Sequence, residues 1–118
     1  MQIEVKESCP NDFLNWDEFA QQPPPDPYDA YGWFHITVGE VGQEAGNDFQ
    51  VCVATPTAFG RLKALGTIPG ILVDWFDAAT VRQAIETKVA STKTNTWHQA
   101  VDQLRTYMLW EYEGMAGN

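Results

Sequence analysis

Two neighbouring runs of alternating apolar residues, 33–38 and 49–54, constrain the fold of this chain more than any other feature. In each run the apolar side chains recur at every second position, which is the period of a β-strand with one buried face. The stretch between the runs contains Gly39, Gly42 and Gly46, and glycine readily adopts the positive φ angles that a reversal requires. The sequence therefore predicts a β-hairpin with one apolar stripe. This stripe comprises Phe34, Ile36, Val38, Phe49, Val51 and Val53.

The segment before the hairpin combines three different patterns. Residues 2–6 alternate between polar and apolar, which predicts a short strand beside the hairpin. Residues 8–20 mix aromatic and acidic side chains at a spacing that a short helical turn could use to bury its aromatics. The prolines of residues 23–27 exclude a helix there and predict an extended connection within the domain.

A helix and a strand are predicted after the hairpin. Thr55 and Pro56 form a helix start signal, and Gly66 and Pro69 a stop signal. The side chains predicted to be buried on this helix are Phe59, Leu62 and Leu65. Residues 71–76 are apolar on both faces apart from Asp74, which predicts a strand that is covered on both sides or lies near the centre of the sheet.

The last third of the chain has two helical stripes, over residues 78–90 and 97–108. Asp77 is the expected N-cap of the first helix, and Thr96 with Gln99 has the capping-box pattern that opens the second. Residues 110–113 alternate strictly, so the chain either returns to the sheet as a last strand or continues the helix.

These elements together predict one α+β domain over residues 1–118, with a mostly antiparallel sheet that includes residues 33–38, 49–54 and 71–76. The two main helices are expected to pack on one face of the sheet, because their apolar stripes need a shared core. The residues expected to be buried between helices and sheet are Val81, Ile85, Trp97 and Leu104.

The formal net charge of −9 is spread unevenly along the chain. Residues 1–48 contain ten acidic residues and a single base, Lys6, whereas residues 49–118 contain six acids and six bases. The acidic first part disfavours nucleic acid and anionic membranes as partners and favours a basic partner. A surface that only keeps the protein soluble is the alternative that charge leaves open.

Residues that could carry catalysis are few. Cys9 and Cys52 lack metal-ligand spacing and are expected to be reduced thiols of a cytoplasmic protein. His35 and His98 have no nucleophile at a recognisable spacing, and no metal or nucleotide motif occurs, so neither a metal nor another cofactor is expected. Glu111 and Glu113 could form a carboxylate pair on one strand face.

The N-terminus lacks a signal-peptide pattern, and no apolar run approaches the roughly 18 residues of a membrane span.

Several motifs together resemble the immunity protein 8 family of bacterial polymorphic-toxin systems. They are Trp33-Phe34-x-Ile36-x-Val38-Gly39, then Gly46-x-Asp48-Phe49-x-Val51-Cys52-x-x-Thr55-Pro56, then Trp97, and finally Trp110-Glu111-Tyr112-Glu113. The resemblance covers residues 31–113 and implies an α+β protein that stays in the cytoplasm of the producing cell. It implies binding and neutralisation of a cognate toxin, and no enzymatic activity. The alternative is a small carboxylate-using enzyme or a metabolite-binding domain.

The acidic segment is the toxin-binding surface that the sequence predicts. An aromatic anchor with charged neighbours is typical of protein interfaces, and Trp16 beside Asp17 and Glu18 has this setting. The residues predicted to meet a basic toxin surface are Asp12, Trp16, Asp17, Glu18, Asp26 and Asp29.

Overall fold

The computed structural model describes residues 1–111 and has an α+β architecture, as predicted. Three long strands, β1 (Ile3–Pro10), β2 (Tyr31–Glu40) and β3 (Asn47–Ala54), form an antiparallel meander. The remaining edge of β3 is shared by two short strands: β4 (Ile71–Leu72) runs parallel to one end of it, and β5 (Leu109–Trp110) antiparallel to the other. The sheet is therefore mostly antiparallel, in the order β1-β2-β3 with β4 and β5 beyond β3.

The predicted hairpin is the centre of this sheet. Phe34 pairs with Val51 and Ile36 with Phe49, so the apolar stripes of β2 and β3 face the same side. Gly42, in the connecting turn, has a φ angle of 85°, the positive value that glycine tolerates without strain.

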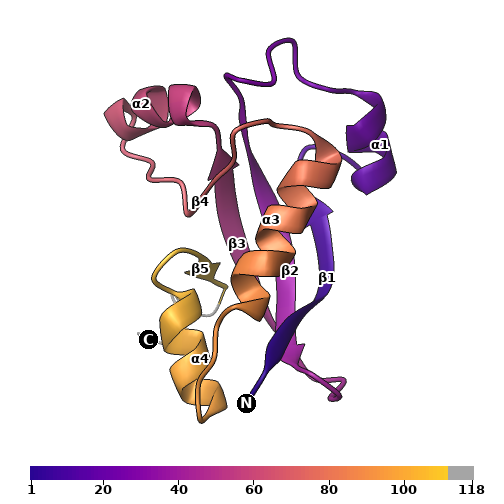
Figure 1. Cartoon of the computed structure of the whole chain (residues 1–118), viewed down its shortest axis with the longest axis vertical. Coiled ribbons are helices and arrows are strands. Elements are labelled where there is room, and N and C mark those ends of the chain that lie inside the picture. The colour runs from indigo at the N-terminus through magenta and orange to yellow at the C-terminus, as the bar shows by residue number, and fades with distance from the viewer. Residues whose placement is uncertain (112–118) are drawn as a thin grey trace.

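Three helices cover the apolar face of the sheet: α1 (Trp16–Gln21), α3 (Ala78–Ala90) and α4 (Trp97–Leu104). In Figure 1, α3 crosses in front of the sheet, with α1 near its upper end and α4 below it. Val81, Ile85 and Leu104 are fully buried, as predicted, but Trp97 is only half-buried against the core. The packing of the two main helices on one face is confirmed.

The opposite face of the sheet is covered only in part. Helix α2 (Pro56–Ala64) packs Ala58 and Leu62 against Cys52 and Ala54 of β3. Residues further along the same face of β2 and β3, such as His35 and Asp48, remain about one third exposed. The sheet thus has one apolar face under helices and a second face that is half apolar and half polar.

The helix start signals in the sequence act as predicted. Thr55, Asp77 and Thr96 are N-caps whose side chains accept a hydrogen bond from the backbone N–H three residues later. The Asp77 carboxylate accepts hydrogen bonds from the backbone N–H of Thr80 and from the side chains of Thr80 and Trp75. These bonds stabilise the ionised carboxylate and so lower its pKa. A capping box would pair the Gln99 side chain with the Thr96 backbone N–H. In the structure the Gln99 side-chain oxygen instead accepts from the Asn95 backbone N–H, one residue earlier.

Three boundary predictions and one further burial prediction are wrong. The strand predicted at 71–76 contains only residues 71–72 and lies at a sheet edge, because the chain leaves β3 after Val73 and exposes Leu72 and Trp75. The first strand extends to Pro10 rather than residue 6, since every residue from Glu7 onward finds a partner on β2 beyond a bulge. Helix α4 ends at Leu104, four residues early.

The fourth error concerns α2, whose exposed Leu65 was predicted to be buried. The helix ends at Ala64, and the positive φ angle of Gly66 turns the chain away, so Ala58 takes the buried position instead.

The last predicted strand is present as β5, and its continuation through residues 112–113 lies outside the described residues. Within residues 1–111 no helix has the length and apolar character that a membrane crossing requires.

Candidate functional site

The five acidic residues predicted to bind a toxin belong to three consecutive parts of the chain. Asp12 follows β1, Asp17 and Glu18 are in the first turn of α1, and Asp26 and Asp29 are in the α1–β2 connection. The end of β1, helix α1 and this connection lie in the upper half of Figure 1. We call these five residues the acidic end. Asp12, Asp17 and Asp26 are exposed, and Glu18 and Asp29 are half-buried.

The local structure leaves most of these carboxylates free for a partner. Asn15 caps α1, so Asp17 and Glu18 lie at the positive end of the helix dipole. Asp26 accepts a hydrogen bond from the Tyr28 backbone N–H at 3.0 Å, which fixes the turn. Asp29 forms an ion pair with Arg61 of α2, and among residues 1–111 it is the one member of the acidic end with such a partner.

Trp16 lies in the core, which corrects its expected position on the surface. The residue is 9% exposed, and its ring stacks on Phe34 with 5.4 Å between ring centroids. The indole N–H donates to the Ser8 backbone oxygen at 3.1 Å, and the Arg82 guanidinium lies 5.5 Å from the ring centroid. Trp16 anchors α1 to the sheet and does not present an aromatic surface to a partner.

Sequence reasoning missed an exposed aromatic pair beside the acidic end. Tyr28 and Trp75 are 61% and 40% exposed, and their rings meet edge to face with 4.8 Å between centroids. The signal that pointed to Trp16, an aromatic residue with acidic neighbours, fits these two residues as well. Tyr28 lies between Asp26 and Asp29, and Trp75 between Asp74 and Asp77.

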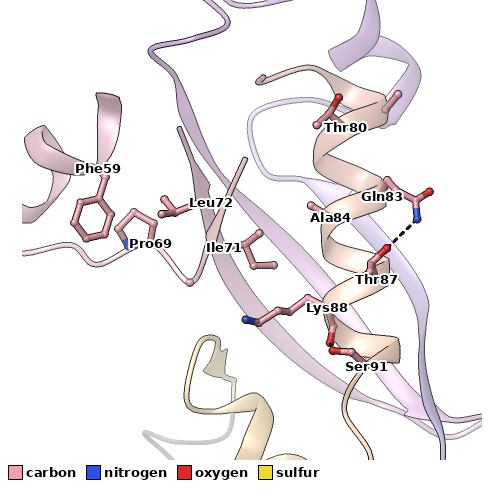
Figure 2. Close-up of a pocket in the computed structure, with 12 residues that line it drawn as sticks. Phe59, Pro69, Ile71, Leu72, Thr80, Gln83, Ala84, Thr87, Lys88 and Ser91 are labelled. Atoms are coloured by element: carbon pink, nitrogen blue, oxygen red, sulfur yellow. Dashed lines mark hydrogen bonds between the residues drawn. The ribbon is translucent and has the colours of Figure 1, made fainter. Parts of the chain in front are cut away.

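A groove of about 1080 Å³ opens between α3 and the segment that leads into β4. Figure 2 shows Ala84, Thr87 and Lys88 of α3 along one side and Phe59, Pro69 and Leu72 across from them. Gln83 donates to the Thr87 hydroxyl at 2.9 Å along the helix. None of the described residues that line the groove is an aspartate, glutamate or histidine, so this groove does not supply the carboxylates that the alternative enzyme function needs.

His35 is surrounded by polar partners on the partly exposed sheet face. Its Nε2 lies 3.2 Å from an Asp48 oxygen and its Nδ1 lies 3.0 Å from a Glu111 oxygen. Asp48 also accepts a hydrogen bond from the Thr37 hydroxyl at 2.6 Å. This network gives His35 a structural role on the sheet face, because it satisfies both ring nitrogens. Glu113, the second member of the predicted carboxylate pair, lies outside the described residues.

Other candidates for chemistry are weak in the part of the chain that the structure describes. Cys9 and Cys52 are both free, as predicted, and burial raises the pKa of the Cys52 thiol to about 11, which keeps it protonated and unreactive near neutral pH. His98 is 89% exposed and lies 3.7 Å from Asp102. No group of three potential ligands suited to a metal ion occurs among residues 1–111.

Comparison with known proteins agrees with the resemblance seen in the sequence. The model of the family described as Immunity protein 8 matches residues 10–115, which is nearly the whole chain. Neither the curated proteins nor the solved structures gave a significant match. Because this match covers nearly the whole chain, the chain belongs to the immunity protein 8 family.

Proposed function

We propose that this protein neutralises a cognate toxin by binding a basic surface of that toxin through the acidic end. Neutralisation then requires occupancy of the toxin and no catalysis by the inhibitor. The site of action is the cytoplasm of the producing cell, where free thiols such as Cys9 and Cys52 persist.

One observation carries this proposal. The five acids of residues 12–29 belong to elements that lie in the upper half of Figure 1, and among residues 1–111 one of these acids, Asp29, has an ion-pair partner. Like charges gathered in this way produce a local negative potential, which attracts a basic surface and raises the rate of association. The membership of the immunity protein 8 family supplies the kind of partner, a toxin.

Association kinetics of charge variants test the proposal. The test variant combines Asp12→Asn, Asp17→Asn and Asp26→Asn, which removes three exposed charges and leaves an oxygen at residue 26 to accept from the Tyr28 amide. Binding is measured by stopped flow or surface plasmon resonance against an inactive form of the cognate toxin. We expect association to slow about tenfold at low salt and to depend less on ionic strength, because steering weakens with the local potential.

The matched control removes the same charge at the other end of the molecule. It combines Glu40→Gln and Glu44→Gln in the β2–β3 hairpin with Asp102→Asn in α4, and all three residues are exposed. Both variants have a formal charge of −6 (−9 plus three). Equal association rates for the two variants across a salt series would show that the acidic end has no special role.

A further inference from the structure

We propose that Tyr28 and Trp75 form the anchor of the acidic end and hold a lysine or arginine side chain of the bound toxin. This inference rests on the proposed function and assigns the contact that keeps the complex together. Tryptophan and tyrosine are enriched among the residues that dominate binding energy in protein interfaces.

The two rings are held in place before any partner arrives. The Phe76 backbone N–H donates to the Pro27 carbonyl at 2.8 Å, which joins the α1–β2 and β4–α3 connections directly next to both rings. The Trp75 indole also hydrogen-bonds to the Asp77 carboxylate. Rings fixed in this way lose little conformational freedom on binding, so more of the contact energy is available to the complex.

The chemistry around the pair favours a cation. The π faces of tyrosine and tryptophan carry partial negative charge and attract ammonium and guanidinium groups. The chain places an aspartate on each side of both rings: Asp26 and Asp29 flank Tyr28, and Asp74 and Asp77 flank Trp75. Asp29 is already paired with Arg61, and Asp77 caps α3, so the exposed Asp26 and Asp74 are the carboxylates that a partner's cation can use. A neutral apolar side chain would gain nothing from these two carboxylates, whereas a lysine or arginine gains from rings and acids together.

The protein's own cations lie over other rings. Arg82 lies over Trp16, Lys88 over Tyr107 and Arg105 over Trp110, at 5.1–5.5 Å from the ring centroids. These are the cation–ring contacts of the described residues, and none involves Tyr28 or Trp75. The exposed aromatic pair is therefore available to a cation supplied by the partner.

Dissociation rates of Trp75 variants from the inactive toxin separate a cation contact from a simple apolar one. Trp75→Phe and Trp75→Leu both lose the hydrogen bond to Asp77 and stay apolar, but only phenylalanine keeps a π face. We expect Trp75→Leu and the double variant Tyr28→Ala, Trp75→Ala to dissociate about tenfold faster or more, with association slowed less than threefold, and Trp75→Phe to stay within about threefold of the wild type. Val41→Ala, which trims an exposed apolar residue in the distant hairpin, is the control and should dissociate like the wild type.

Each outcome decides between the two proposals. Equal rates for Trp75→Phe and Trp75→Leu would overturn the cation assignment. Wild-type dissociation of the double alanine variant, together with slow association of the acidic-end triple variant, would overturn the anchor and leave the proposed function standing. Wild-type kinetics in both variants would overturn the anchor and the proposed function together. Circular dichroism and urea unfolding of each variant confirm that the fold is retained.

Discussion

At the scale of single residues, short-range hydrogen bonds define where the elements begin. Asp77 is an example, because its carboxylate accepts from the Thr80 backbone N–H at 2.7 Å and so caps α3. Its pKa is lowered by this bond, which means that the folded state holds the proton less tightly than the unfolded state does. The resulting stabilisation is fully present above the unfolded pKa of about 4 and is lost as the pH falls through the lower folded pKa.

We therefore predict that Asp77→Ala lowers the free energy of unfolding by about 1 kcal/mol at pH 7, the usual cost of losing an N-cap. The difference from the wild type should shrink as the pH falls below about 4. Asp77→Asn should retain most of the stability at pH 7, since asparagine is an equally good cap. Urea unfolding at several pH values measures all three proteins. A loss in Asp77→Ala that is as large at pH 3 as at pH 7 would contradict the role of the ionised carboxylate.

At the scale of elements, the fold depends on how two short strands share one edge of β3. The start of β4 and the turn between α4 and β5 touch at Gly70, where an added Cβ would lie 1.9 Å from the Tyr107 backbone oxygen. No side chain fits there, because the clash is with backbone and not with the end of a flexible side chain. Gly70 is thus required for the close approach of the two connections.

Gly70→Ala should lower the free energy of unfolding by about 1–3 kcal/mol, the usual cost of overpacking, through displacement of the segment that leads into β5. Gly60→Ala is the matched control. An added Cβ at Gly60 meets nothing within 4 Å, and the residue is inside helix α2, so this change should stabilise the protein by about 0.5–1 kcal/mol. Thermal and urea unfolding measure both. Equal stability of the two variants would show that the contact at Gly70 is not rigid.

At the scale of the whole molecule, the acidic residues of the N-terminal half do not form a single face. The acidic end and the β2–β3 hairpin, which contains Glu40 and Glu44, lie at opposite ends of the long axis (Figure 1). The charge asymmetry of the sequence therefore becomes two separate acidic regions in the structure. Only the acidic end has an exposed aromatic pair beside it, among the ring pairs of the described residues.

The acidic-end triple variant should fold as stably as the wild type, within about 0.5 kcal/mol, because exposed charges contribute little to folding. Urea unfolding measures this at one ionic strength for the triple variant and for the control variant with Glu40→Gln, Glu44→Gln and Asp102→Asn. A loss of more than about 1.5 kcal/mol in the triple variant alone would assign the acids a structural role, and its slower binding would then have to be attributed to altered structure.

The sequence by itself determined the local elements of this protein. Period-two alternation predicted the β2–β3 hairpin, and the capping residues Thr55, Asp77 and Thr96 predicted three helix starts, since these signals act between residues that are close along the chain. The family motifs, which are tied to the same elements, were also readable from the sequence.

Contacts between distant segments were decided only by the tertiary structure. The apolar run after Gly70 looks like a central strand, but only residues 71–72 pair with β3, at an edge that β4 shares with β5. Trp16 has acidic neighbours in the sequence, yet the ring is buried because β2 brings Phe34 beneath it. Tyr28 and Trp75 are 47 residues apart and meet only because two loops are joined at Pro27 and Phe76. Periodicity specifies which side of an element is apolar, whereas the order of strands specifies what that side meets.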